Sequence, residues 1–165
     1  RFEALPGELR YKGARFAGRK AARVIEKDAK ANAAAIDDPA TPESIAANIT
    51  VSFDRRYFRR TRDLKFSVGV RGGSGTYKRS RGGRKGPVTQ VAGAAYQTLG
   101  DSGNPGGDTF YWWWQEFGTS KFPANRFMQR ALEQNIAAAT EEFGRELEKW
   151  MDRNVDKLLA RGGGR

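Results

Sequence analysis

Arginines and carboxylates are the residues of this chain that could take part in chemistry. The chain has no histidine and no cysteine, which excludes imidazole and thiolate metal ligands, disulfides, and Ser-His or Cys-His nucleophile pairs. Carboxylates could still hold magnesium or act as general acid and base. They are scattered, however, with Asp37 and Asp38 in a proline-rich loop and most of the others late in the chain. We therefore expect no catalytic site, no metal site and no cofactor.

The densest basic cluster is RRYFRRTR, with five arginines in eight residues. Arginine suits the geometry of phosphate groups, and Tyr57 and Phe58 within the cluster could stack on bases. The segment matches no nucleic-acid recognition signature, so a basic hairpin tip in solvent is an equal alternative. The candidate partner or DNA contacts in this cluster are Arg55, Arg56, Arg59, Arg60 and Arg62.

A glycine-rich basic segment follows the cluster. Residues 64–100 contain nine glycines, seven basic residues and no acidic residue. This composition cannot bury enough apolar surface to fold by itself, which predicts a long exposed loop or arm. No Rossmann or Walker pattern occurs in it, which argues against a nucleotide site. Its candidate contacts to DNA or to an acidic partner are Lys78, Arg79, Arg81, Arg84 and Lys85.

The positive charge of the chain is uneven. The formal net charge is +11, yet residues 126–165 carry 8 basic and 7 acidic groups, so the excess belongs to the preceding part. Such a field favours a polyanion or a strongly acidic protein surface as partner, or it keeps the protein soluble. No apolar run approaches the roughly 20 residues that span a membrane, and no signal peptide is visible. The chain starts at Arg1 without a methionine, which leaves room for residues upstream.

The apolar pattern predicts one domain of the α+β class. We expect a small antiparallel sheet packed by a long N-terminal and a long C-terminal helix, with an extended basic loop. The predicted ranges are 1–35 for the N-terminal helix, 49–117 for the sheet with its long loop 71–107, 126–160 for the C-terminal helix and 161–165 for a flexible tail.

Local signals place the ends and faces of these elements. Alternation in ITVSF and FSVGV predicts two half-buried strands that pair as antiparallel neighbours. Thr41 is expected to cap a short helical turn running through Ala47, and Asn125 to cap the C-terminal helix. On that helix the apolar residues from Leu132 to Leu158 recur at steps of three and four and predict its buried stripe. The stripe of the N-terminal helix is thin and alanine-rich, so a sheet or a second protomer can approach it closely.

The aromatic run that contains three consecutive tryptophans predicts the strongest strand, Phe110 to Phe117, with aromatic side chains on both faces. Such rings belong more often to a core or an interface than to a ligand platform. Helices then cover both faces, or one face meets another subunit. Gly118 follows where a permissive backbone is needed. The residues assigned to the core or to a subunit interface are Tyr111, Trp112, Trp113, Trp114, Phe117, Phe127, Leu132, Phe143 and Trp150.

The block YWWWQEFGTSKFPANRFMQRALE, residues 111–133, resembles the gene-ten-like tail-component family of tailed bacteriophages, the tail-completion or neck proteins. That family's motif is an aromatic strand, E-F-G-T-S-K, a small hydrophobic residue, P-A, and a phenylalanine-led helix start ending in A-L. The order of predicted elements also fits over most of the chain. Departures occur at Arg126 and Arg130, where the family often has prolines, and at Gln129, where it has arginine. The matching residues are Glu116, Phe117, Gly118, Thr119, Ser120, Lys121, Pro123, Ala124, Phe127, Met128, Ala131 and Leu132.

The resemblance implies a virion structural protein at the head–tail junction, assembled in the cytoplasm of the host bacterium and without catalytic activity. Family members are similar to ring components, usually taken as hexameric, that surround the DNA channel at the upper end of the tail. The implied partners are other copies of the chain, the tail terminator and head–tail connector proteins, with at most non-specific contact to DNA. Residues 116–121 are then a family marker and a turn. The alternatives are a non-specific nucleic-acid-binding protein acting outside the virion and, more remotely, an enzyme of the packaging machinery.

Overall fold

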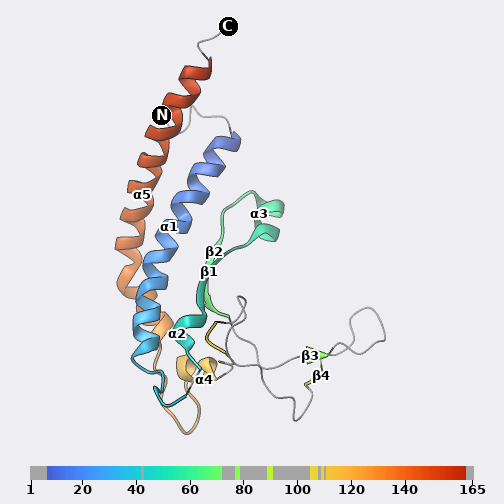
Figure 1. Ribbon diagram of the computed structural model, residues 1–165, viewed down its shortest axis with the longest axis vertical. Helices are drawn as coiled ribbons and strands as arrows, with labels where there is room; N and C mark the ends of the chain where they lie inside the picture. Colours follow the sequence, from blue (N-terminus) through green and yellow to red (C-terminus); the bar gives the residue numbers. More distant parts are fainter. Residues whose placement is uncertain are drawn as a thin grey trace. The chain divides into compact units, whose positions relative to one another are not determined.

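Two long helices and a two-stranded antiparallel sheet make up the fold, which confirms the predicted α+β class. The computed structural model describes residues 7–41, 43–71, 77–78, 89–90, 105–107, 109 and 111–162. The predicted loop 71–107 falls largely outside these residues. In chain order the elements are α1 (Gly7–Ala34), α2 (Ile45–Asn48), β1 (Ile49–Phe53), α3 (Arg55–Thr61), β2 (Phe66–Val70), β3 (Tyr77–Lys78), β4 (Thr89–Gln90), α4 (Trp112–Phe117) and α5 (Phe127–Gly162) (Figure 1).

The chain divides into two compact units. Unit 1 comprises Arg1–Ala29, Val51–Gly69 and Arg130–Arg165, and unit 2 comprises Lys30–Thr50 and Val70–Gln129. Each unit has buried residues of its own: Ala17 and Ala139 belong to unit 1, for example, and Ile45 and Phe127 to unit 2.

The strands β1 and β2 occupy the predicted residues and form one sheet. At one end the N–H of Asp54 donates to the carbonyl oxygen of Lys65 at 3.0 Å. At the other end the N–H of Arg71 donates to the carbonyl oxygen of Asn48 at 2.7 Å. The first residue of one segment thus pairs with the last residue of the other: Asn48 pairs with Arg71, and Asp54 pairs with Lys65. This reversed order is that of antiparallel strands.

The connection between β1 and β2 is the helix α3, where a hairpin tip had been the alternative. Asp54 caps this helix, because its carboxylate accepts hydrogen bonds from the N–H groups of Arg56 and Tyr57 at 3.0 and 2.9 Å. The Tyr57 bond is the main reason that the pKa of Asp54 lies below its ordinary value. The helix ends at Arg62, whose φ of 65° is left-handed.

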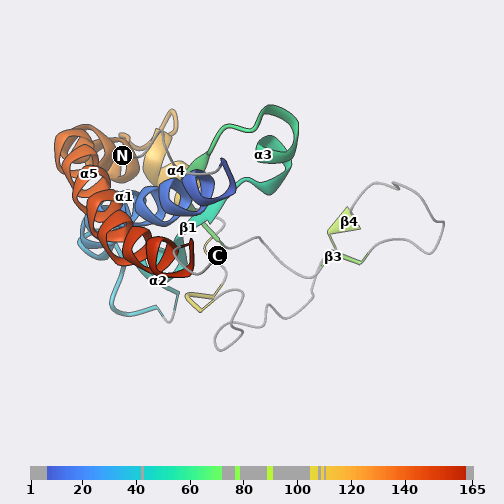
Figure 2. The ribbon, with the colours of Figure 1, turned by 90° about the horizontal axis from the view of Figure 1, so that it is seen from above.

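In unit 1, α1 lies beside α5 (Figures 1 and 2) and also contacts β2. Two glycines make these contacts close: a Cβ atom at Gly13 would lie 2.6 Å from Cε3 of Trp150 in α5, and one at Gly18 would lie 2.5 Å from Cε2 of Phe66. Five residues correspond to a rotation of about 140° around a helix. The sequence predicted that small residues of the N-terminal helix would allow one close neighbour. In the structure, α1 has two, α5 and β2, on different faces.

Replacing Gly13 by alanine should lower the free energy of unfolding by about 1 kcal/mol. Alanine is the better helix former, but here its methyl group would overlap the indole ring of Trp150, and overpacking costs more than the gain in propensity. The matched control is Gly144→Ala, also inside a long helix, where nothing lies within 4 Å of the added Cβ. This control should be stabilising by about 0.5–1 kcal/mol. Urea unfolding of both variants checks the contact, and a stabilised Gly13 variant would contradict it.

The buried stripe of α5 differs from the prediction. Leu132 and Ile136 were assigned to it by their spacing, yet they are 49% and 57% exposed. Ala139, which the spacing also assigned to the stripe, is buried as predicted, and Ala131 and Glu146, which the spacing did not assign to it, are buried too. Gly13 of α1 leaves room for the large ring of Trp150 in α5, whereas Leu132 and Ile136 remain exposed.

Polar groups complete the contact between α1 and α5. The side-chain amide of Asn135 donates to a carboxylate oxygen of Asp28 at 2.7 Å. Glu146 accepts a hydrogen bond from Lys149 at 2.9 Å. This bond, aided by the positive charges of Lys149 and of Lys20 in α1, holds the pKa of Glu146 below its ordinary value. The carboxylate of Glu146 is thus ionised at neutral pH next to a cation of α1.

Unit 2 is organised around the buried side chain of Asn48. Its amide nitrogen donates to the carbonyl oxygen of Gly107 and to Oγ1 of Thr109, both at 2.9 Å. Its amide oxygen accepts from the N–H of Gly106 at 2.7 Å. This network joins the end of α2 to the segment that leads into α4. A side chain at Gly106 would collide with the Ser44 carbonyl oxygen and with Asn48, so this position requires glycine.

The cap of the short helix before β1 is Ser44, and the prediction of Thr41 was wrong. Ser44 Oγ accepts from the N–H of Ala47 at 3.2 Å, and the helix begins at the next residue, Ile45. The carboxylate of Asp37 also accepts from Ser44 Oγ and from the N–H groups of Ile45 and Ala46. Asp37, which precedes the helix by eight residues, therefore shares the capping with Ser44. Such a contribution depends on the fold of the chain and not on the local sequence of the helix.

The predicted strand Phe110–Phe117 is wrong, because residues 112–117 form the helix α4. A run of adjacent aromatic residues carries neither the twofold period of a strand nor the 3.6-residue period of a helix. The backbone finds its partners locally: the N–H of Gln115 donates to the carbonyl oxygen of Tyr111 at 3.3 Å, and that of Gly118 to Trp114 at 2.8 Å. The sheet predicted over 49–117 thus lacks its third major strand.

Candidate contact surfaces

Glu116 lies at the centre of the motif block and is buried. Its two carboxylate oxygens accept hydrogen bonds from the N–H groups of Met128 and Gln129, at 2.8 and 3.0 Å. These are first-turn donors of α5 that have no partner within the helix. A negative charge is also favourable at a helix N-terminus. Glu116 therefore caps α5 from α4, in place of the predicted cap Asn125.

The turn after Glu116 is held by its own backbone and by Thr119. Gly118 has a φ of 74°, and a Cβ there would lie 2.8 Å from the backbone nitrogen of Ala124, which confirms that a permissive residue is needed. Thr119 Oγ1 accepts from the N–H groups of Lys121 and Phe122 at 3.2 and 3.1 Å. Ser120, Lys121 and Pro123 are exposed. The described residues of the motif thus shape a turn.

The start of α5 departs from the pattern that the resemblance implies. Arg126 precedes the helix with a φ of 50°, which proline cannot adopt. The family often has proline at this position. The helix start of this chain is therefore built on a different backbone, stabilised by Asn125, whose side chain and N–H both donate to Gln115.

Four exposed rings form an aromatic surface on unit 2. Trp113, Trp114, Phe117 and Phe122 expose 54%, 52%, 58% and 69% of their surface. The ring centroids of Trp113 and Phe117 are 4.2 Å apart, one helical turn along α4. An open groove of about 310 Å³ adjoins them, lined by Tyr111, Trp114, Gln115, Phe122, Pro123 and Asn125. Large exposed apolar patches of this kind mark interaction sites.

The other residues assigned to a core or interface divide by burial. Phe127 is fully buried. Tyr111, Trp112, Phe143 and Trp150 are half-buried, and Leu132 is exposed. Sequence reasoning missed Phe122, although its ring is the most exposed of the four in the aromatic surface. Phe122 lies among polar residues, glycine and proline in a turn, and this position could have indicated that its ring is exposed.

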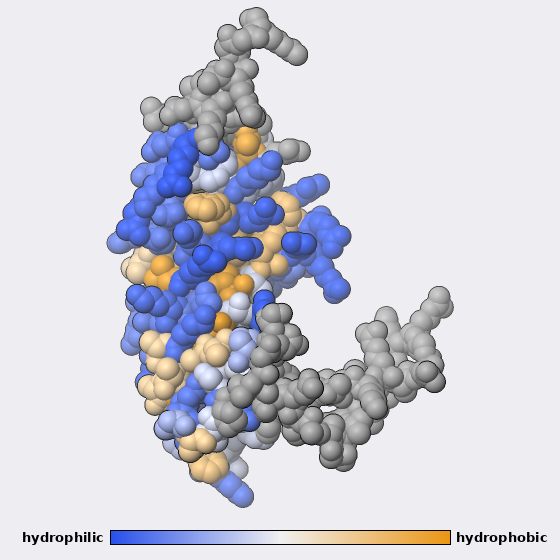
Figure 3. All heavy atoms as spheres, viewed as in Figure 1, coloured by the Kyte–Doolittle hydropathy of each residue, from blue (hydrophilic) through white to orange (hydrophobic). Residues whose placement is uncertain are grey.

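The five arginines of the RRYFRRTR cluster are all exposed, on α3 and at its end. Hydrophilic side chains project where this helix lies in the space-filling view (Figure 3). Phe58 does not lie free for stacking on bases, because it contacts Tyr11 of α1 at 5.2 Å and Phe53 of β1 at 5.8 Å between ring centroids. Tyr57 is half-buried, with Nζ of Lys65 at 5.4 Å from its ring centroid.

The second set of basic residues falls mostly outside the described part of the chain. Lys78 belongs to the two-residue strand β3, which pairs with β4. Arg79, Arg81, Arg84 and Lys85 lie outside the described residues. Within the described part of the chain, no group of three acidic residues comes together as a metal site. No helix in that part is long and apolar enough to cross a membrane.

Comparisons with known proteins give no match: no protein-family model, no curated protein and no solved structure matches this chain. Support for a function therefore comes from the chain's own residues.

Proposed function

We propose that this protein is a virion structural component of a tailed bacteriophage, a tail-completion or neck ring protein that helps join tail to capsid around the DNA channel. The observation that carries the proposal is the block of residues 111–133. Its sequence resembles the motif of such proteins, and its polar motif residues serve a structural cap and turn. The same block exposes a surface of aromatic rings. Exposed apolar rings of this kind support a role in assembly.

The aromatic surface suits contact with a second copy of the chain. Each half-exposed ring presents on the order of 100 Å², so the four rings together offer roughly 400–500 Å². A stable interface buries about 800 Å² on each partner. The aromatic surface would thus supply the apolar centre of such an interface, with polar neighbours as its rim. The further partners of the ring in this proposal are the tail terminator and the head–tail connector.

Depletion of the protein during phage assembly tests the proposal. Particles made without it should accumulate as DNA-filled heads and separate complete tails. Adding the purified protein to a mixture of the two should restore joined, infectious particles. Joined particles formed in its absence at the normal yield would refute the proposed role.

The second candidate is a non-specific nucleic-acid-binding protein acting outside the virion. The exposed arginines of α3 favour it, since clustered basic residues bind phosphate backbones without sequence preference. This role predicts a monomer that binds duplex DNA tightly and that purified particles lack. A ring of this protein found in purified phage particles would support the first candidate over the second.

A further inference from the structure

Arginines also lie on the part of α1 that packs against α3, and one of them, Arg10, lines a pocket together with Arg62. Arg15 of α1 places its guanidinium carbon 5.7 Å from the ring centroid of Phe53 in β1. The rings of Tyr11 and Phe58 meet edge to face and join α1 to α3 within unit 1. We call the resulting set the basic surface; its members are Arg10, Arg15, Arg55, Arg56, Arg59, Arg60 and Arg62.

The helical geometry of α3 separates its arginines from its aromatic residues. At 100° per residue, Arg55, Arg56, Arg59 and Arg60 fall within an arc of about 140°. Tyr57 and Phe58 fall on the opposite side, where Phe58 contacts the rings of Tyr11 and Phe53. The outer arc of α3 therefore contains only arginines and no apolar residue.

The charges of the basic surface are not cancelled locally. None of its arginines has an ion-pair partner within 4 Å among the residues that the structure describes. Of the acidic residues that flank α3 in the chain, Asp54 is engaged as the cap of α3, and Asp63 lines the same pocket as Arg62. A strong positive field therefore remains at this surface.

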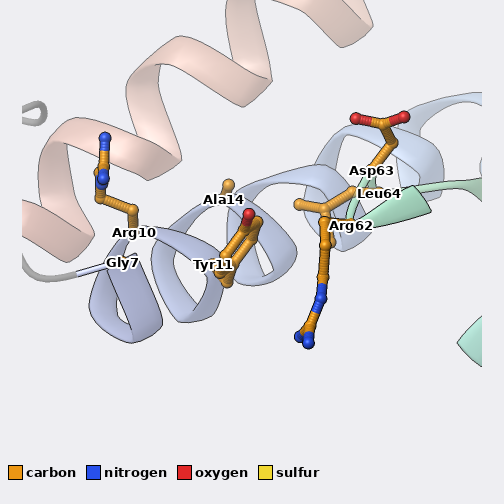
Figure 4. Close-up of a pocket in the computed structure, with 7 residues that line it drawn as sticks. All are labelled: Gly7, Arg10, Tyr11, Ala14, Arg62, Asp63 and Leu64. Carbon is orange, nitrogen blue, oxygen red and sulfur yellow. The ribbon is translucent and has the colours of Figure 1, made fainter. Parts of the chain in front are cut away.

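An open pocket of about 430 Å³ lies where α1 meets the end of α3, lined by Gly7, Arg10, Tyr11, Ala14, Arg62, Asp63 and Leu64 (Figure 4). The side chains of Arg10 and Arg62 extend in opposite directions from it, with Tyr11 between them. Two guanidinium groups that diverge in this way cannot grip one small anion together. They suit an extended ligand whose charges are spread along its length.

We propose that the basic surface binds the phosphate backbone of duplex DNA without reading its sequence. A protein partner fits less well, because interface centres are apolar and the outer arc of α3 is not. Base stacking is disfavoured because Phe58 is engaged in packing. The inference rests on the proposed function for one point, the choice of duplex DNA as the polyanion. The surface itself follows from the contacts between α1 and α3.

Fluorescence anisotropy with a labelled DNA duplex tests the proposal on the full chain. The seven residues of α3 span about 10 Å, which covers about three phosphates of one strand at 3.4 Å each. The logarithm of the binding constant should fall with the logarithm of salt concentration, and two unrelated sequences should bind equally. Changing Arg55, Arg56, Arg59 and Arg60 to serine should weaken binding about tenfold or more and reduce the slope by about 3. Adding Arg10→Ser and Arg62→Ser to this variant should reduce the salt slope further.

The matched control removes the same charge elsewhere on unit 1, by changing the exposed residues Arg23, Lys27, Arg130 and Arg153 to serine. It should retain most of the salt slope, and an equal loss would show that only net charge matters. Inorganic phosphate at constant ionic strength should not compete. Competition by millimolar phosphate, tighter binding of poly-glutamate than of DNA, or no DNA binding at about 50 mM salt would each overturn the proposal. Because purified protein is used, failure here leaves the assembly role to its own test.

Discussion

Replacing Glu116 by alanine is expected to lower the free energy of unfolding by about 3 kcal/mol. The buried carboxylate accepts two hydrogen bonds from the first turn of α5, and a hydrogen bond to a charged group contributes about 1.5–3 kcal/mol. Alanine leaves the N–H groups of Met128 and Gln129 without these acceptors. Urea unfolding followed by circular dichroism measures the loss. Glutamine keeps the shape and one acceptor oxygen, so Glu116→Gln should lose about half as much.

A second glutamate provides the control for this prediction. Glu148 is exposed on α5, and its replacement by alanine should change the free energy of unfolding by less than about 0.5 kcal/mol. If Glu116→Ala proved as harmless as Glu148→Ala, the carboxylate would not be a structural cap. Its place in the motif would then call for a role in binding or chemistry.

Changing Trp113, Phe117 and Phe122 together to serine should convert the assembled protein into monomers. Aromatic residues at the centre of an interface commonly contribute about 2 kcal/mol or more each. Losing all three should therefore raise the dissociation constant by about a thousandfold or more. The fold of the monomer should survive, because each of these rings is more than half exposed. Analytical ultracentrifugation measures the association, and circular dichroism checks the fold.

The control for the aromatic surface is an exposed apolar pair on α5. Leu132 and Ile136 on α5 are exposed to a similar degree, and changing both to serine should leave the sedimentation of the assembly unchanged. Dissociation by this pair, with an intact assembly in the aromatic variant, would move the subunit interface to α5.

The elements that the sequence predicted well are those with a clear period. Alternation in ITVSF and FSVGV placed β1 and β2 at their observed residues. The long helices followed from good helix formers and from the prolines after α1. By contrast, three adjacent tryptophans fit no period, and α4 was expected as a strand. The cap of α5 was missed for the same reason, since only a helix brings Glu116 to the N–H groups of Met128 and Gln129.

Faces and surfaces were harder to predict than elements. The spacing placed the large apolar residues Leu132 and Ile136 on the apolar stripe of α5, yet both are exposed. Trp150 instead packs against Gly13 of α1. The aromatic rings of α4 were expected in a core or an interface, and the sequence could not say that Trp113 and Trp114 would be about half exposed. The exposure of the arginines of α3 was predictable, because charged side chains are mostly exposed to water. That Arg10 of α1 lies close to Arg62 could not be predicted from the sequence, because it depends on the packing of α1 against α3.

Cryo-electron microscopy of purified phage particles tests the central claim most directly. The proposal predicts a ring of this chain at the neck, around the DNA channel between head and tail, with the aromatic surface of each copy in contact with its neighbour. Particles whose neck contains no copy of the chain, with mass spectrometry finding none elsewhere in the virion, would contradict it.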